Sequence, residues 1–266
     1  MSGASGVPGP AGTPRFAARL LAEFVGTFAL VFAGTGAIVV DAVSGGAIGH
    51  AGIALTFGLV IAVFVYAYKD LSGAQYNPAV SVALWLRGVF PGREVVPYVA
   101  AQLAGATAAS GIVAVGVRRI AAEAVMEGAA LVQGATSAGA AASDAVAGLG
   151  ATVPGPGGAL VALPVEVLAT FLLVTVILGV VRAGERANPW AGIAIGGTVA
   201  LCALAFGPIS GASMNPARSF GPIVFAHGGA RSYWLYVVGP VVGGILAVLV
   251  DRAVDIPVGL TTEEKR

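Results

Sequence analysis

The chain has 266 residues, of which 57% are hydrophobic and only 10% charged, and its formal net charge is +1. Soluble domains carry about 25% charged residues, so this composition excludes an ordinary soluble protein. The near-zero net charge also gives no indication of a nucleic-acid partner.

Six apolar stretches occur along the chain, at about residues 17–40, 51–68, 95–117, 159–181, 190–206 and 232–250. Each is close to the ~20 residues that a helix needs to cross a lipid bilayer. A soluble chain of this length could not bury so much apolar surface. The pattern therefore predicts an all-α integral membrane protein with six transmembrane helices.

The two ends of the chain differ from these stretches. Residues 1–14 lack the charged segment that begins a signal peptide, and we expect them to form a disordered N-terminal tail. Residues 253–266 are expected to form a C-terminal tail. With six spans, both tails lie on one side, and that side receives 10 of the 14 Lys and Arg residues. Positive charge concentrates in cytoplasmic loops, so we predict a multi-pass protein of the cell membrane with both termini cytoplasmic.

A ten-residue segment occurs twice. Ser72–Ser81 reads SGAQYNPAVS in the first half, and Ser210–Ser219 reads SGASMNPARS in the second, with seven of ten positions identical. Three spans lie in each half, and because three is odd, the second half must be inverted relative to the first. Inverted repeats are common in membrane transport proteins, whose functional site lies at the repeat interface near the midplane.

Each copy is followed by an apolar piece too short to span a membrane, VSVALWL in the first half and RSFGPIVFA in the second. Asn77 and Asn215 can each be the N-cap of a short helix, with the following Pro as the first helical residue. We therefore predict two re-entrant half-helices that meet N-terminus to N-terminus, because non-helical backbone at that depth must be buried or line a water path. A plain N-cap role is the alternative for each asparagine.

Glu23, Glu166 and Arg218 are charged side chains well inside the predicted membrane segments, where charge is costly. Glu23 and Glu166 occupy matching places in the first helix of each half. They either accept hydrogen bonds from the re-entrant loops or act as proton-coupling acids of a transporter. Arg218 follows Asn215 by three residues and either faces an aqueous constriction or binds only loop carbonyls.

These segments carry a resemblance to the aquaporin, or major intrinsic protein, family. AEFVGTF, SGAQYNPAV, YVAAQLAGA, AIGGTVA and SGASMNPARSFGP match the family pattern at its spacing, and the resemblance extends over about residues 16–252. It implies an aquaporin-like channel domain over residues 15–252, with repeats at about 16–117 and 159–252. It also implies a homotetramer with one pore per subunit.

The same resemblance implies a set of pore residues. The two central motifs would be Asn77, Pro78 and Ala79, and Asn215, Pro216 and Ala217. A selectivity filter would be formed by Phe57, Ala203, Ala212 and Arg218. Strict water channels usually carry His at the position of Ala203, and glycerol channels typically carry a second aromatic at that of Ala212. The filter therefore matches neither subgroup, and its two methyl groups predict a wider opening than that of a strict water channel.

We expect a passive channel for water, with leakage of small neutral solutes such as glycerol and exclusion of protons and ions. As in aquaporins generally, two half-helix N-termini and the amide donors of both asparagines can orient a central water and interrupt a proton relay. The alternatives are a facilitator for glycerol or another small neutral solute, and a proton-coupled secondary transporter. An enzyme, a cofactor or a metal site is not expected, since the spans contain no nucleophile–base pair and no His cluster.

Overall fold

The computed structural model describes residues 15–126, 146–184, 188–226 and 229–254. The N-terminal tail expected at 1–14 lies outside these residues, as does all of the expected C-terminal tail except its first two residues.

Within these described ranges, six helices are long and apolar enough to cross a membrane. They are α1 (Phe16–Val43), α2 (Gly49–Ser72), α4 (Gly92–Met126), α6 (Gly158–Ala183), α7 (Ala191–Ser210) and α9 (Leu235–Val254). The prediction of six spans is therefore confirmed. The helices extend beyond the apolar stretches because backbone hydrogen bonding continues into the polar residues that flank the membrane core.

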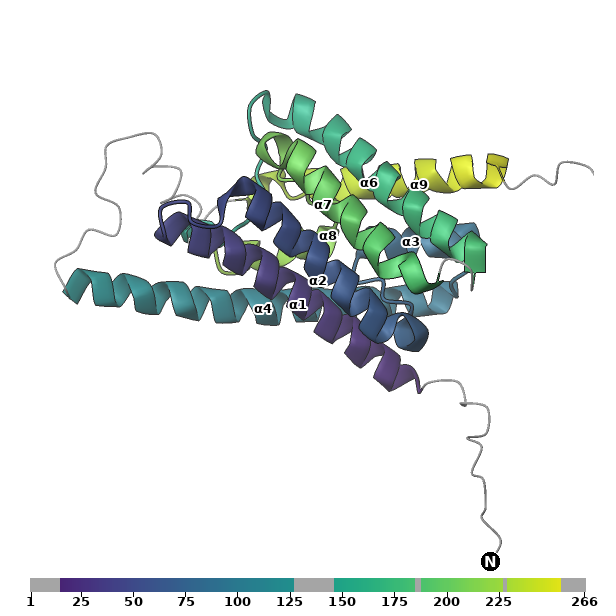
Figure 1. The fold of residues 1–266 in the computed structure, drawn as a ribbon, viewed down its shortest axis with the longest axis horizontal. Coiled ribbons are helices and arrows are strands. Elements are labelled where there is room, and N and C mark those ends of the chain that lie inside the picture. Colours follow the sequence, from purple (N-terminus) through teal and green to yellow (C-terminus); the bar gives the residue numbers. More distant parts are fainter. Residues whose placement is uncertain (1–14, 127–145, 185–187, 227–228, 255–266) are drawn as a thin grey trace, which may run out of the picture.

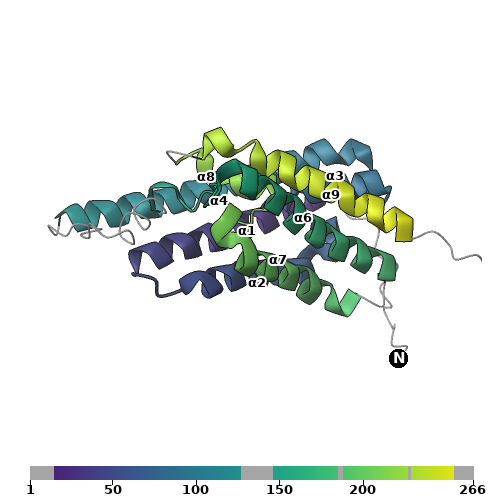
Figure 2. The same cartoon turned by 90° about the horizontal axis from the view of Figure 1, so that it is seen from above.

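One short helix lies between the second and third spans of each half. These two helices are α3 (Pro78–Arg87) and α8 (Pro216–Ile223), and two 3₁₀ turns, η2 (Asn188–Trp190) and η3 (Ala230–Ser232), complete the described elements. The half-helix α3 packs against α9, and α8 packs against α4, as Figures 1 and 2 show. Each half-helix therefore contacts the last span of the opposite half, which interlocks the two inverted repeats.

Glycines allow the two halves to approach closely. The helices α2 and α7 cross at Gly58 and Gly196, which are separated in the sequence by the same interval as Ser72 and Ser210. A Cβ atom on Gly58 would lie 2.6 Å from the carbonyl oxygen of Gly196, and one on Gly196 would lie 2.3 Å from that of Gly58. Small residues are used in this way at helix contacts in membranes, where packing replaces the hydrophobic effect.

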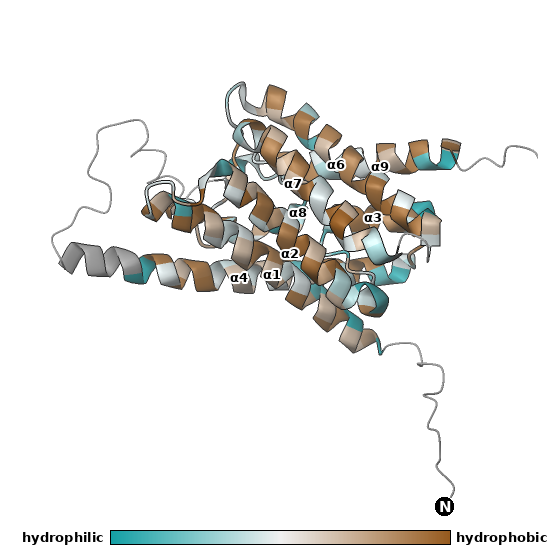
Figure 3. Cartoon of the chain, in the orientation of Figure 1, coloured by the Kyte–Doolittle hydropathy of each residue, from teal (hydrophilic) through white to brown (hydrophobic). Residues whose placement is uncertain are grey.

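The outer surface of the bundle is apolar along the length of the helices. Figure 3 shows hydrophobic residues covering the middle of the spans and hydrophilic residues near their ends. Large side chains such as Leu59, Val63 and Val96 remain exposed on this surface. A soluble monomer does not expose contiguous apolar area of this extent, so the fold is that of a multi-pass membrane protein.

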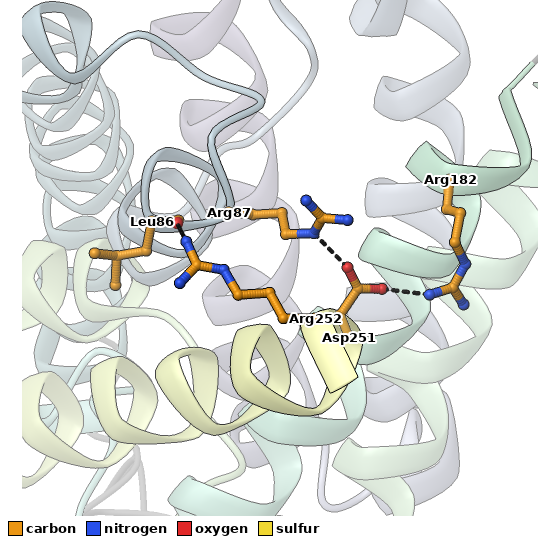
Figure 4. Close-up of polar contacts among 5 residues, drawn as sticks. All are labelled: Leu86, Arg87, Arg182, Asp251 and Arg252. Carbon is orange, nitrogen blue, oxygen red and sulfur yellow. Dashed lines mark hydrogen bonds and ion pairs between the residues drawn. The ribbon is translucent and has the colours of Figure 1, made fainter. Parts of the chain in front are cut away.

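An ionic cluster joins α3, α6 and α9 at the end of the bundle where α9 terminates (Figure 4). Asp251 on α9 accepts hydrogen bonds from Arg87 Nε at 2.5 Å and from Arg182 Nη1 at 2.6 Å. The neighbouring Arg252 donates to the carbonyl oxygen of Leu86 in the last turn of α3. Positive charge at a helix C-terminus is favourable, so the cluster both caps α3 and fixes its far end.

Substitution of Asp251 tests the contribution of this cluster to stability. The Asp251 side chain is only 6% exposed, so Asp251→Asn leaves two guanidinium groups without their buried carboxylate. We expect a loss of about 2 kcal/mol, typical of a hydrogen bond to a charged group, and a fall of roughly 4–8 °C in the unfolding midpoint. The measurement is thermal unfolding of the purified protein in detergent.

Asp70→Asn is the matched control. Asp70 pairs with Lys69 Nζ at 3.0 Å, but its side chain is 82% exposed. An exposed pair contributes less than about 1 kcal/mol. Equal shifts for the two variants would contradict a structural role for the Asp251 cluster.

Candidate functional site

The two segments that follow α2 and α7 have the same unusual backbone. Both helices end at a glycine in the left-handed region, Gly73 with φ +90° and Gly211 with φ +84°. Beyond each glycine, two further residues that are not glycine also have positive φ: Ala74 and Tyr76 in the first half, and Ala212 and Met214 in the second. Such a residue costs about 1–3 kcal/mol and persists only where its surroundings hold it.

Buried carboxylates contact these strained segments. Glu23 accepts hydrogen bonds from the backbone N–H groups of Gln75 at 3.0 Å and Tyr76 at 2.7 Å. Glu166 accepts from those of Ser213 and Met214, both at 2.8 Å. Each carboxylate is fully buried and also accepts from a serine hydroxyl at the end of the preceding helix, Ser72 for Glu23 and Ser210 for Glu166. The N–H groups that the broken helix leaves without helical partners are thereby satisfied.

Two tyrosine hydroxyls also bind at these sites, and their contacts were not predicted from the sequence. Tyr98 donates its hydroxyl to the carbonyl of Ser72 at 2.9 Å, and Tyr236 donates to that of Ser210 at 2.8 Å. The two tyrosines are separated by the same interval as the two serines that they bind. This shared interval was the feature of the sequence that could have predicted the pair of contacts. It also extends the repeat into the third span of each half.

The first half has an additional contact. Gln102 on α4 donates through Nε2 to Glu23 at 2.8 Å and to the hydroxyl of Ser81 at 3.1 Å. The equivalent position in the second repeat is occupied by Pro240, which has no donor. The two loop sites are therefore alike in their carboxylate and tyrosine contacts and differ in what binds the half-helix serine.

Asn77 and Asn215 begin the two half-helices and also join them. The Oδ1 atom of each accepts from the backbone N–H two residues later, at 2.9 Å in both cases. The Nδ2 of Asn77 donates to the carbonyl of Met214 at 2.7 Å, and the Nδ2 of Asn215 donates to that of Tyr76 at 2.8 Å. N-capping thus uses the oxygen of each amide, and the cross-link uses one of its two N–H bonds. A second N–H remains on each side chain.

A cavity of about 550 Å³ runs through the bundle past both asparagines. Its wall extends from Lys69 and Asp70 near the end of α2 to His50 near the start of that helix. All four expected filter residues line this cavity: Phe57, Ala203, Ala212 and Arg218. The remaining expected site residues lie behind the wall and do not line the cavity: Glu23, Pro78, Ala79, Glu166, Pro216 and Ala217.

Arg218 lies beside Phe57 on the cavity wall. Its guanidinium carbon is 4.9 Å from the centroid of the Phe57 ring, close enough for a cation–π contact. Its Nη1 also donates to the carbonyl of Gly150 at 2.8 Å. The residue therefore both lines the cavity and binds a loop carbonyl. The methyl groups of Ala203 and Ala212 add little bulk to the rest of the wall.

His50 is a further cavity residue that sequence reasoning did not place there. Its Nε2 lies 2.8 Å from the carbonyl of Leu204, which can only accept, so Nε2 is the donor. The ring occupies space that Gly207 leaves free, since a Cβ there would lie 2.8 Å from His50 Cε1. His50 precedes Phe57 by seven residues, two helical turns along the same face, and this spacing was the signal for its position.

Among the residues that the structure describes, no three His, Cys, Asp or Glu side chains form a group able to hold a metal ion. Cys202 is fully buried, its sulfur lies 3.8 Å from the carbonyl of Ala169, and it does not line the cavity.

Comparison with known structures shows the fold. The X-ray structure of the aquaglyceroporin from Plasmodium falciparum superposes with a TM-score of 0.70, covering 91% of this chain and 98% of that one, at 22% sequence identity. The all-α fold with six spans, two half-helices and an inverted repeat is therefore confirmed.

Sequence comparison shows the family. Aquaporin AqpM from Methanothermobacter thermautotrophicus is 41% identical over 254 residues, covering 87% of this chain and 94% of that protein. Aquaporin NIP1-1 from Zea mays is 39% identical over 233 residues, covering 86% and 72% of the two chains. The family model described as "Major intrinsic protein" matches residues 11–251. The chain belongs to the major intrinsic protein family of membrane channels.

Proposed function

We propose that this channel conducts water passively as its main permeant and leaks small neutral solutes such as glycerol. The observation that carries this proposal is the composition of the cavity wall near Arg218. Arg218 contacts Phe57 on this wall, and the methyl groups of Ala203 and Ala212 line the same cavity. A guanidinium donates hydrogen bonds to water or a solute hydroxyl, while two methyl groups leave room for a molecule larger than water.

Proton and ion exclusion follows from the centre of the cavity. The N-termini of α3 and α8 both face this region, and each contributes about half a positive charge before screening. The free N–H of Asn77 and of Asn215 can hold one water by its oxygen, which turns the hydrogens outward and interrupts a proton relay. The cross-links between the two loops support this role because they fix both amides beside the cavity.

The contacts of the two carboxylates argue against proton-coupled transport. Glu23 accepts four hydrogen bonds and Glu166 accepts three, and neither lines the cavity. A coupling acid must exchange its proton with the transport path. We therefore assign both residues to support of the re-entrant loops.

The wider setting of the channel is part of the same proposal. The channel domain comprises residues 15–252, with repeats at about 16–117 and 159–252. The protein lies in the cell membrane with both termini cytoplasmic, as the excess of positive charge on that side supports. It assembles as a homotetramer with one pore per subunit. A facilitator specialised for glycerol is the second candidate, supported by the small side chains of Ala203 and Ala212 on the cavity wall.

Arg218→Val tests the filter assignment. Removing the charge and bulk of Arg218 from the cavity wall should leave water permeability intact or raised and increase glycerol permeability by about tenfold, equivalent to ~1.4 kcal/mol of barrier. Stopped-flow light scattering of proteoliposomes measures both permeabilities. A low activation energy for water flux in the parent protein distinguishes a channel from a transporter, and unchanged selectivity in the variant would remove Arg218 from the filter.

Ala212→Cys tests whether residue 212 faces the constriction. The parent protein should resist mercurials, because Cys202 is buried away from the cavity. The variant should lose most of its water permeability on mercury treatment and recover it with a reducing thiol. Persistent flux after complete modification of the new thiol would show that Ala212 lies outside the constriction.

Ala203→His tests the width of the filter. An imidazole at this position takes up space on the cavity wall and adds a donor, so glycerol leakage should fall by about tenfold, ~1.4 kcal/mol of barrier, with most of the water flux retained. The same proteoliposome assay serves, with Ala203→Val as the control for volume without a donor. A parent protein that is already impermeable to glycerol would contradict our inference of width from side-chain size.

A further inference from the structure

A buried hydroxyl chain connects the segment before α6 to the half-helix that carries Arg218. Thr152 lies in this segment, and its Oγ1 donates to the hydroxyl of Ser219 at 2.7 Å. The Ser219 hydroxyl is 2.6 Å from that of Ser213, which donates to the carbonyl of Asn215 at 2.9 Å. Since each hydroxyl has one hydrogen, Ser219 is the donor to Ser213. The chain therefore runs in one direction, from Thr152 to the backbone of Asn215.

The segment meets α8 at two adjacent residues. Gly150, two residues before Thr152, places its carbonyl 2.8 Å from Nη1 of Arg218, and Thr152 binds Ser219, the next residue along the half-helix. Thr152 and Ser219 are 3% and 1% exposed, so their contact is shielded from bulk water. The hydrogen bond of Thr152 therefore fixes the stretch of backbone whose carbonyl holds the guanidinium.

The corresponding serine of the first half has a different partner, so the bond between Thr152 and a half-helix serine is specific to the second half. Ser81 is the counterpart of Ser219, and its hydroxyl accepts from Gln102 on a membrane-spanning helix. In the second half Pro240 stands in place of Gln102, which leaves the hydroxyl of Ser219 to Thr152. The difference lies in the half that bears the filter arginine.

We infer that Thr152 is a positioning residue for Arg218, acting through its hydrogen bond to Ser219 to hold the Gly150 carbonyl against the guanidinium and so set the solute selectivity of the channel. This inference rests on the proposed role of Arg218 in the filter. A guanidinium whose backbone partner is not fixed samples several positions, and the cavity beside it then widens for part of the time.

Thr152→Val and Thr152→Ser test the inference in proteoliposomes. Valine keeps the shape of threonine and removes the hydroxyl, so the ratio of glycerol to water permeability should rise about two- to tenfold, the range that one lost hydrogen bond allows. Serine keeps the hydroxyl and should restore the parent ratio. Thr107→Val is the matched control, because the Thr107 hydroxyl binds only the Leu103 carbonyl of its own helix and does not line the cavity.

Ser219→Ala removes the same hydrogen bond from its other end. Thr152 itself lines the cavity, whereas Ser219 does not. A rise in the permeability ratio in Ser219→Ala, similar to that in Thr152→Val, would support an effect carried by the bond. A parent-like ratio in Ser219→Ala would show that Thr152 acts directly on the permeant, and the positioning role would be wrong.

Arg218→Val serves as the reference that separates the two proposals. If Arg218→Val raises the ratio and Thr152→Val in that background raises it no further, Thr152 acts through Arg218. If Arg218→Val raises the ratio but Thr152→Val alone leaves it unchanged, or changes it no more than Thr107→Val, the positioning role is wrong and the filter assignment stands. If Arg218→Val leaves the ratio unchanged, the proposed filter fails, and the role of Thr152 fails with it.

Discussion

Two buried carboxylates make it possible for the backbone to leave the helical conformation inside the bundle. In a bilayer every backbone polar group needs an internal partner, and both re-entrant segments place consecutive N–H groups where no helix can satisfy them. Glu23 and Glu166 accept those N–H groups and hold residues with positive φ in place. The half-helices, the paired asparagines and the cavity beside them all depend on these contacts.

The inverted repeat gives the molecule two equivalent loop sites. A few residues differ between the two sites, and these differences determine what each half-helix binds. The contact of Gly58 with Gly196, the tyrosine hydroxyls and the asparagine cross-links all obey the repeat. Gln102 does not, since Pro240 stands at its counterpart. The first half-helix is consequently bound to a membrane-spanning helix through its serine, while the second is bound to the segment before α6.

The pattern of the sequence predicted much of this architecture. Apolar stretches of the right length predicted six spans, and the Asn-Pro pairs predicted where the half-helices begin, because N-capping and the preference of Pro for the first turn are local effects. The tyrosine contacts and the position of His50 were not predicted from the sequence, although both have regular spacings. A spacing shows which residues share a face, but the neighbouring helix determines whether that face meets a cavity.

The sequence by itself determined the membrane environment, the number of spans and the inversion of the halves. These properties follow from composition, from local capping and from the odd number of spans in each half. The four filter residues, Phe57, Ala203, Ala212 and Arg218, were instead expected from resemblance to a family pattern. Only the tertiary structure decided that the asparagine amides bind each other's loops and that Arg218 holds the carbonyl of Gly150 while lying beside Phe57. Those contacts join residues that are far apart in the sequence, and their geometry arises from the way the interlocked half-helices pack.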